Sequence, residues 1–159
     1  MTSIRRSFGP VTDYLPHRPP MLLIDGIVEV SDARAVCRAT IHPDCAFAID
    51  GVVHAAAMIE LVAQACAIYV GVLSARDGNP PRTGLIIACR EIAFAVDGLA
   101  VGDEVTIVAD KVFGQQQLAA FTGTVTRGET LCATIQLSVA DAELVGSPLP
   151  SGASAGADG

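Results

Sequence analysis

The sequence predicts an α+β fold in which an antiparallel sheet wraps around one long central helix. A single stretch of helical length and almost wholly apolar composition runs from about Gly51 to Ser74. Segments of β-prone composition, separated by short turns that carry Gly or Asp, lie on both sides of it. A helix that is apolar all round must be buried all round, and among so many strands only a surrounding sheet offers that surface.

Composition and charge restrict the class of protein. The chain has 159 residues, 51% of them hydrophobic and 17% charged, which is typical of one globular domain with a sizeable core. A net charge of −7 argues against nucleic acid or an anionic membrane as the main partner, because both bind clustered Lys and Arg. An acidic carrier protein is less clearly excluded, since Arg5, Arg6 and Arg18 could form a local basic patch.

The cysteines and the N-terminal region indicate the compartment. The five cysteines are scattered and show no metal-binding spacing, so we expect reduced thiols that pack in the core. No apolar run follows the two N-terminal arginines, so no signal peptide is visible. Both observations favour a cytoplasmic location.

The N-terminal half is expected to form a hairpin and then the helix. Residues 1–20 read as an irregular lead-in, "MLLIDGIVEV" predicts a strand over Met21–Val30, and "AVCRATI" predicts its partner after the turn "SDAR". The segment "HPDCAFAID" reads as a loop. Asp50 stands where a helix N-cap is expected, so the helix should begin at about Gly51 and stop before "RDGNPPR".

The C-terminal half has the residue composition of β-strands. The four β-prone runs there are "TGLIIACREIAFAV", "DEVTIVADKVF", "QLAAFTGTVT" and "ETLCATIQLSV". Short turns join them, which predicts antiparallel pairing. We expect residues 1–140 to form the domain and residues 141–159, which are rich in Pro, Gly and small polar residues, to be disordered.

Three polar side chains interrupt the predicted helix: His54, Glu60 and Gln64. They favour a buried core helix over a membrane span. A buried acid usually indicates either a function or a firm partner, so a structural ion pair at a dimer interface is the alternative for Glu60. Gln64 follows Glu60 by four residues, a spacing at which its amide can orient the carboxyl group.

Three segments resemble a known family. "YLPHRPPMLLIDGIVEV" is similar to the opening of the bacterial 3-hydroxyacyl-ACP dehydratases, where an LPHR-x-P segment leads into an apolar strand. "IELVAQACAIYVG" resembles their helix, with its Glu-x-x-Ala-Gln element at Glu60, Ala63 and Gln64. "TGLIIACREIAFAVDGLAVGDEVTIVADKV" matches their later strands. The resemblance covers about residues 12–140 and implies the hot-dog fold, the sheet-around-helix arrangement predicted above.

One departure narrows the resemblance. Those dehydratases carry a His-Phe-Pro-Gly loop before the helix, whereas "PDCAFAID" contains no histidine. The chain is therefore more similar to the divergent dehydratase-like branch of aryl-polyene and related type II polyene pathways. That branch keeps the N-terminal Pro-His and the helix Glu, and its subunits can act as heterodimers. The resemblance thus implies either a homodimer or a heterodimer with a second hot-dog dehydratase subunit.

The implied reaction is the dehydration of a 3-hydroxyacyl thioester, on an acyl carrier protein or CoA, to the trans-2-enoyl thioester. It needs a base, an acid and a donor for the thioester carbonyl. We predict Glu60 as the acid and His17, in the "LPHR" element, as the base, although a structural His17 is an equal alternative. His54 would lie about 120° from Glu60 on a helical wheel, and His42 reads as a turn residue.

Substrate binding is assigned to Gly51, His54 and Gln64, because a helix starting at Gly51 would present free N–H groups to the carbonyl oxygen. No metal or nucleotide motif occurs, so the phosphopantetheine arm of the substrate is the only prosthetic group expected. Two alternatives remain open: a hot-dog thioesterase, and a non-catalytic or half-site subunit that completes a partner's site.

Overall fold

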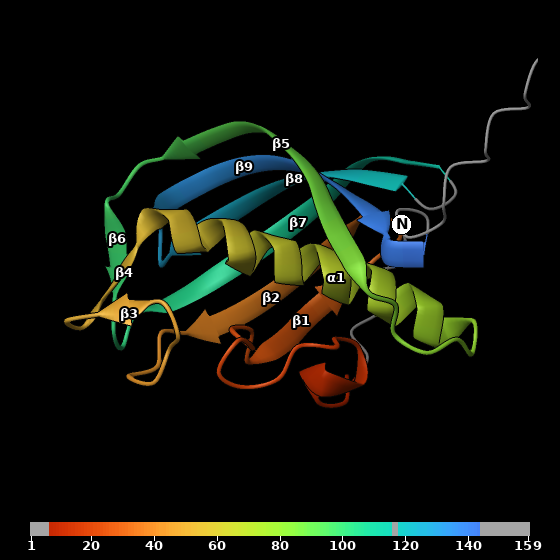
Figure 1. Ribbon diagram of the computed structural model, residues 1–159, viewed down its shortest axis with the longest axis horizontal. Helices are drawn as coiled ribbons and strands as arrows, with labels where there is room; N and C mark the ends of the chain where they lie inside the picture. The colour runs from red at the N-terminus through yellow and green to blue at the C-terminus, as the bar shows by residue number, and fades with distance from the viewer. Residues whose placement is uncertain (1–6, 116–117, 144–159) are drawn as a thin grey trace, which may run out of the picture.

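The computed structural model describes residues 7–115 and 118–143 as a main sheet, a small sheet and one long helix (Figure 1). The main sheet is antiparallel throughout. Its spatial order is β1 (Gly26–Val30), β2 (Arg34–Thr40), β7 (Glu104–Gln115), β8 (Leu118–Arg127), β9 (Thr130–Asp141) and β5 (Gly84–Phe94). The small sheet contains β3 (Ala48–Ile49), β4 (Val52–His54) and β6 (Gly98–Ala100).

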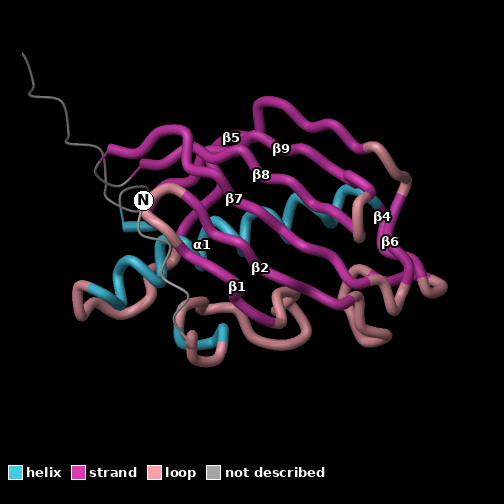
Figure 2. The backbone as a smooth tube through the Cα atoms, turned by 180° about the vertical axis from the view of Figure 1, so that it is seen from behind, coloured by secondary structure: helices cyan, strands magenta, loops and turns pink. Residues whose placement is uncertain are grey.

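Helix α1 (Met58–Arg76) lies across the concave face of the main sheet, and Figure 2 shows the sheet from behind with the helix beneath it. Alternate residues of the strands point into the core: in β7, Val105, Ile107 and Ala109 are buried, and the residues between them are not. The sheet wrapped around one helix and the strands predicted after the helix are therefore confirmed, with the short β6 as an addition.

The predicted start of the helix is wrong. Asp50 and Gly51 both have positive φ angles, 52° and 78°, and form the two-residue turn between β3 and β4. Two successive positive φ angles are the signature of a type I′ hairpin, for which Asp-Gly is a preferred sequence. Asp50 is thus a turn residue and not a cap. The chain passes through β4 and a single 3₁₀ turn, Ala55–Ala57, before α1 begins.

The predicted strand Met21–Val30 is shorter than expected, because β1 begins only at Gly26. The preceding residues 15–25, here called the N-terminal strap, run along the helix instead. Leu15 and Ile24 of the strap are buried in the core. Just before the strap, Tyr14 approaches the helix at Gly71 so closely that an added Cβ atom there would collide with the Tyr14 carbonyl oxygen.

The burial of α1 is incomplete on one face. The helix is long and apolar enough to cross a membrane by length and composition, but 56% of its most apolar window is buried inside the protein, as expected of a core helix. Ile59, Ala63, Ala67 and Val70 are only half-buried. The predicted burial on every side is therefore wrong for this face. The predicted tail of residues 141–159 is wrong at its first residues, because Asp141 ends β9 and the Ala142 amide donates to the Thr83 carbonyl. Residues 144–159 lie outside the described residues, so their disorder stays a prediction.

Candidate active site

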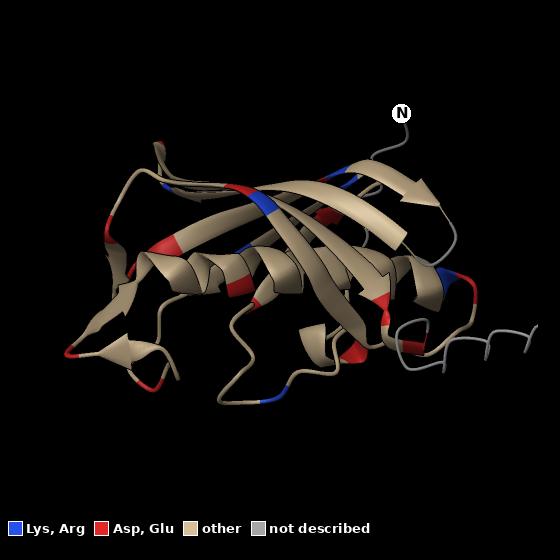
Figure 3. Ribbon diagram, turned by 45° about the horizontal axis from the view of Figure 1, so that its top comes forward, with Lys and Arg blue, Asp and Glu red and all other residues tan. Residues whose placement is uncertain are grey.

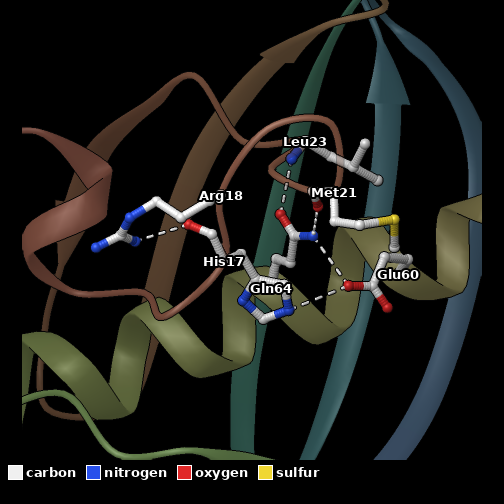
Figure 4. A network of polar contacts seen from close by, with 6 residues as sticks. All are labelled: His17, Arg18, Met21, Leu23, Glu60 and Gln64. Carbon is white, nitrogen blue, oxygen red and sulfur yellow. Dashed lines mark hydrogen bonds and ion pairs between the residues drawn. The ribbon is translucent and has the colours of Figure 1, made fainter. Parts of the chain in front are cut away.

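Gln64 organises the polar centre of the helix. It is fully buried, and its amide nitrogen donates to Glu60 Oε1 at 2.9 Å, which confirms the predicted hydrogen bond between the two side chains. The same nitrogen donates to the Met21 carbonyl at 2.7 Å, and its oxygen accepts from the Leu23 amide at 2.9 Å (Figure 4). Gln64 therefore ties the N-terminal strap to the helix and fixes one carboxylate oxygen at the same time.

His17 projects from the strap toward the same carboxylate. Its Nε2 atom lies 3.4 Å from Glu60 Oε1, and the two side chains are 30% and 26% exposed, so both are reachable from the adjoining space. Arg18 holds the strap in this bend by donating to the carbonyl oxygens of Leu15 and His17, both at 2.8 Å. Arg5 and Arg6, the other arginines of the predicted carrier patch, lie outside the described residues.

The other ring nitrogen of His17 is buried and has no hydrogen-bond partner among the described residues. A proton on this Nδ1 atom would leave an unpaired buried N–H group, at a cost of about 1–3 kcal/mol. The tautomer with its proton on Nε2, facing the Glu60 carboxylate, is therefore favoured in the single chain.

A cavity of about 830 Å³ opens beside this pair. His17 and Glu60 line one part of it, and apolar side chains of α1, β5, β8 and β9 line most of the rest. Along the helix its wall is formed by a stripe at spacings of three and four residues: Glu60, Ala63, Ala67, Val70 and Ser74. The small residues of this stripe leave space beside the acid–base pair, an arrangement suited to proton transfer on a chain-like substrate.

Two of the predicted substrate-binding residues lie elsewhere. Gly51 forms the hairpin turn, and His54 ends β4 with its Nδ1 atom accepting from the Ala56 amide at 3.1 Å. Neither lines the cavity. Their assignment rested on a helix beginning at Gly51, so it fails with that start. His42 pairs with Asp25 at 3.0 Å, also away from the cavity, which agrees with a structural role near a turn.

Sequence reasoning missed Lys111, which also lines the cavity. A signal was present: the alternation Val105, Ile107, Ala109 places residue 111 on the inward face of its strand. Figure 3 shows the Lys and Arg residues widely spaced over the ribbon in that view. Within the described residues, no three His, Cys, Asp or Glu side chains come together as a metal site.

Burial makes the core thiols poor nucleophiles. It raises the pKa of Cys37 to about 12 and raises the pKa of Cys66, on the helix, still further from its ordinary value. Neither thiol takes part in the pair at Glu60, whose contacts involve only His17 and Gln64 among the described residues. The chemistry of this cavity is therefore that of a carboxyl group and an imidazole.

Solved structures share this architecture. The dehydratase heterocomplex ApeI:P from Xenorhabdus doucetiae matches with a TM-score of 0.82 and 23% identity, over 89% of this chain and 100% of that chain. An uncharacterized protein from Pyrococcus horikoshii matches with a TM-score of 0.61 and 15% identity, over 86% and 96%. A hypothetical thioesterase from Streptococcus pneumoniae, solved with coenzyme A, matches with a TM-score of 0.57 and 14% identity, over 73% and 84%. These likenesses establish the hot-dog fold.

The family follows from the sequence match. No curated protein matches the chain. The model of the ApeP-like family, described as ApeP dehydratase, matches residues 9–147, which is most of the chain. The protein therefore belongs to the ApeP-like family of dehydratases.

Proposed function

We propose that the chain dehydrates a 3-hydroxyacyl thioester, carried on the phosphopantetheine of an acyl carrier protein or CoA, to the trans-2-enoyl thioester. The observation that supports this most directly is the 3.4 Å contact between His17 Nε2 and Glu60 Oε1 in the wall of a largely apolar cavity. A base and an acid so close together can act on adjacent carbons of one bound chain.

In the proposed reaction His17 Nε2 removes the proton from C2, and the C2–H electron pair forms the new double bond. The C3–O bond breaks, and the hydroxyl group leaves as water with a proton from the Glu60 carboxyl group. His17 is then protonated and Glu60 ionised, so one proton passed from Nε2 to Oε1 restores both groups. Gln64 keeps that oxygen in place through its hydrogen bond to Oε1.

The partner is proposed to join at β5. Within the part of the chain that the structure describes, this strand pairs only with β9, so its other edge is open there. Apolar side chains along it are exposed: Leu85, Ile86, Ile87, Ile92 and Phe94. Open apolar strand edges are normally paired or covered in natural proteins. We propose a second hot-dog subunit as the occupant. The heterocomplex named for the ApeI:P structure favours a different chain over a second copy.

A half-site subunit is the second candidate, and the His17 ring favours it. As the base, His17 must keep Nε2 free of a proton, which places the proton of the neutral ring on Nδ1. That atom has no acceptor among the described residues. If the cost of this tautomer is too high, the chain supplies Glu60 while the partner supplies the base.

The test measures enoyl thioester by mass from a 3-hydroxyacyl thioester, with the chain alone and with the second hot-dog subunit. Glu60→Gln and His17→Ala are compared with His42→Gln, a matched histidine control outside the cavity. Loss of general acid–base catalysis should lower turnover by at least about a hundredfold for both site variants and leave the control unchanged. Sensitivity to Glu60 alone, and only with the partner present, would establish the half-site candidate. Release of free acid would replace dehydration by thioester hydrolysis.

A further inference from the structure

Lys111 is the only lysine in the chain, and it occupies an unusual position. It continues the inward-facing series Val105, Ile107 and Ala109 of β7. Lysine is rare on the inward face of a sheet unless it is paired. Lys111 stands where β7 leaves β2: the pairing with β2 ends at Asp110, the Lys111 amide still donates to the Ala33 carbonyl, and Lys111 pairs with Phe121 of β8.

The ammonium group lies against an aromatic ring, and two carboxylates that line the same cavity, Asp77 and Asp141, form no ion pair with it. Its Nζ atom lies 5.7 Å from the centroid of the Tyr69 ring, a cation–π contact, and Tyr69 is itself anchored by donating to the Asp32 carbonyl. The pairing of β7 with β8 shifts register between Lys111 and Phe113, a bulge of the kind that redirects side chains. Among the described residues, no carboxylate forms an ion pair with Lys111.

Lys111 lines the same cavity as Glu60, at a distance along the helix that a substrate chain can span. Tyr69 follows Glu60 by nine residues, which is roughly 13 Å of helix at 1.5 Å per residue. An extended carbon chain advances by roughly 1.3 Å per bond, so about ten bonds cover that length. The intervening wall includes Ala63, Ala67 and Leu118. These three side chains offer apolar contact to a hydrocarbon chain.

From this geometry we propose that Lys111 recognises the far end of the acyl chain and selects substrates that carry an oxygen acceptor there. The reacting carbons would lie at His17 and Glu60, the apolar chain along the small-residue stripe, and the terminal oxygen at the Lys111 ammonium. This assignment rests on the proposed acyl thioester function and deepens it. A purely apolar chain of the same length would leave the ammonium group without an acceptor and bind less well.

The test compares two 3-hydroxyacyl N-acetylcysteamine thioesters of equal length, one with a terminal hydroxyl group and one without. These substrates contain no phosphate. We expect the catalytically competent assembly to prefer the hydroxylated substrate by about tenfold in kcat/KM, the size of one charge-assisted hydrogen bond. Lys111→Met should remove the preference by lowering kcat/KM for the hydroxylated substrate and not for the plain one, and Lys111→Arg should restore part of it.

Three results would overturn the proposal: no preference in the wild type, an equal loss for both substrates in Lys111→Met, or a Lys111→Met effect seen only with phosphopantetheine substrates. The third result would show that Lys111 binds the phosphate of the phosphopantetheine arm.

A binding measurement separates this proposal from the dehydration itself. Reductive ¹³C-methylation labels only Lys111 and the N-terminal amine. The Lys111 signal should shift with the ω-hydroxy acyl thioester and not with the plain one, even in Glu60→Gln. Shifts with both or with neither would refute the proposal.

Discussion

Replacing Gln64 with leucine tests whether the strap and the acid–base pair form one unit. Leucine is close to glutamine in size, so the helix can keep its packing while all three hydrogen bonds of the amide are lost. The Leu23 amide and the Met21 carbonyl then have no side-chain partner. His17 lies on the same strap, so its position relative to Glu60 should be lost as well.

The magnitude follows from the two orphaned backbone groups. Each buried polar group left without a partner costs about 1–3 kcal/mol. Because the strap can move and admit water, we expect Gln64→Leu to lower the free energy of unfolding by about 2–4 kcal/mol in total. The loss of turnover should exceed what this destabilisation explains, since the base would no longer be held beside the acid.

Urea unfolding and dehydratase turnover are measured on the same preparations, at a temperature where every variant is folded. Val62→Ala is the matched control: Val62 is fully buried on α1 and should cost about 2 kcal/mol through packing alone. We expect both variants to be destabilised and only Gln64→Leu to be inactive. If Gln64→Leu matches the wild type in stability, or if both variants keep equal turnover, the strap does not position the site.

Two further predictions concern charge and thiol chemistry. Hydrogen bonds from the Arg127 side chain and from the Ala100 amide hold the pKa of Asp103 below its ordinary value. Ionised Asp103 therefore stabilises the fold at any pH above its unfolded-state pKa. This stabilisation is lost as the pH falls through its folded-state pKa. Asp103→Asn should therefore unfold at lower urea concentration than the wild type at pH 7, with the difference vanishing in acid. Cys89 is exposed on β5, whereas burial raises the pKa of Cys37 to about 12. An alkylating reagent, with the products followed by mass spectrometry, should modify Cys89 quickly and Cys37 only after unfolding. A bound second subunit should slow the alkylation of Cys89. Unchanged alkylation of Cys89 in the complex would exclude the β5 edge as the interface.

Sequence patterns predicted the sheet and the helix because both depend on periodicity and burial. They misplaced the helix start because "IDGVVHAAA" satisfies two local rules at once. Asp before an apolar run is typical of an N-cap, and Asp-Gly between β-branched residues is typical of a type I′ hairpin. The pairing of β4 with β6, nearly fifty residues later, decides for the hairpin, and no local pattern contains that information.

In the candidate site, too, local contacts could be predicted from the sequence and long-range contacts could not. The contact between Glu60 and Gln64 follows from a spacing of four residues on one helix. The contact between His17 and Glu60 joins residues more than forty positions apart, and only the family resemblance pointed to it. The strap that creates this contact has no periodic pattern. It is held by backbone groups of Met21 and Leu23, which carry no sequence signature.

The incomplete burial of α1 has a physical consequence for assembly. A helix this apolar is stabilised by removing its surface from water, yet the face with Ala63 and Ala67 remains half-open within one chain. The open edge of β5 lies beside the same cavity, since Leu85 and Ile86 of this strand line it. A subunit joined at β5 would thus extend the sheet and cover the cavity wall in one step. Excluding water there would also strengthen the electrostatic interaction between His17 and Glu60. Assembly and turnover should therefore be coupled, with mutations along β5 lowering both.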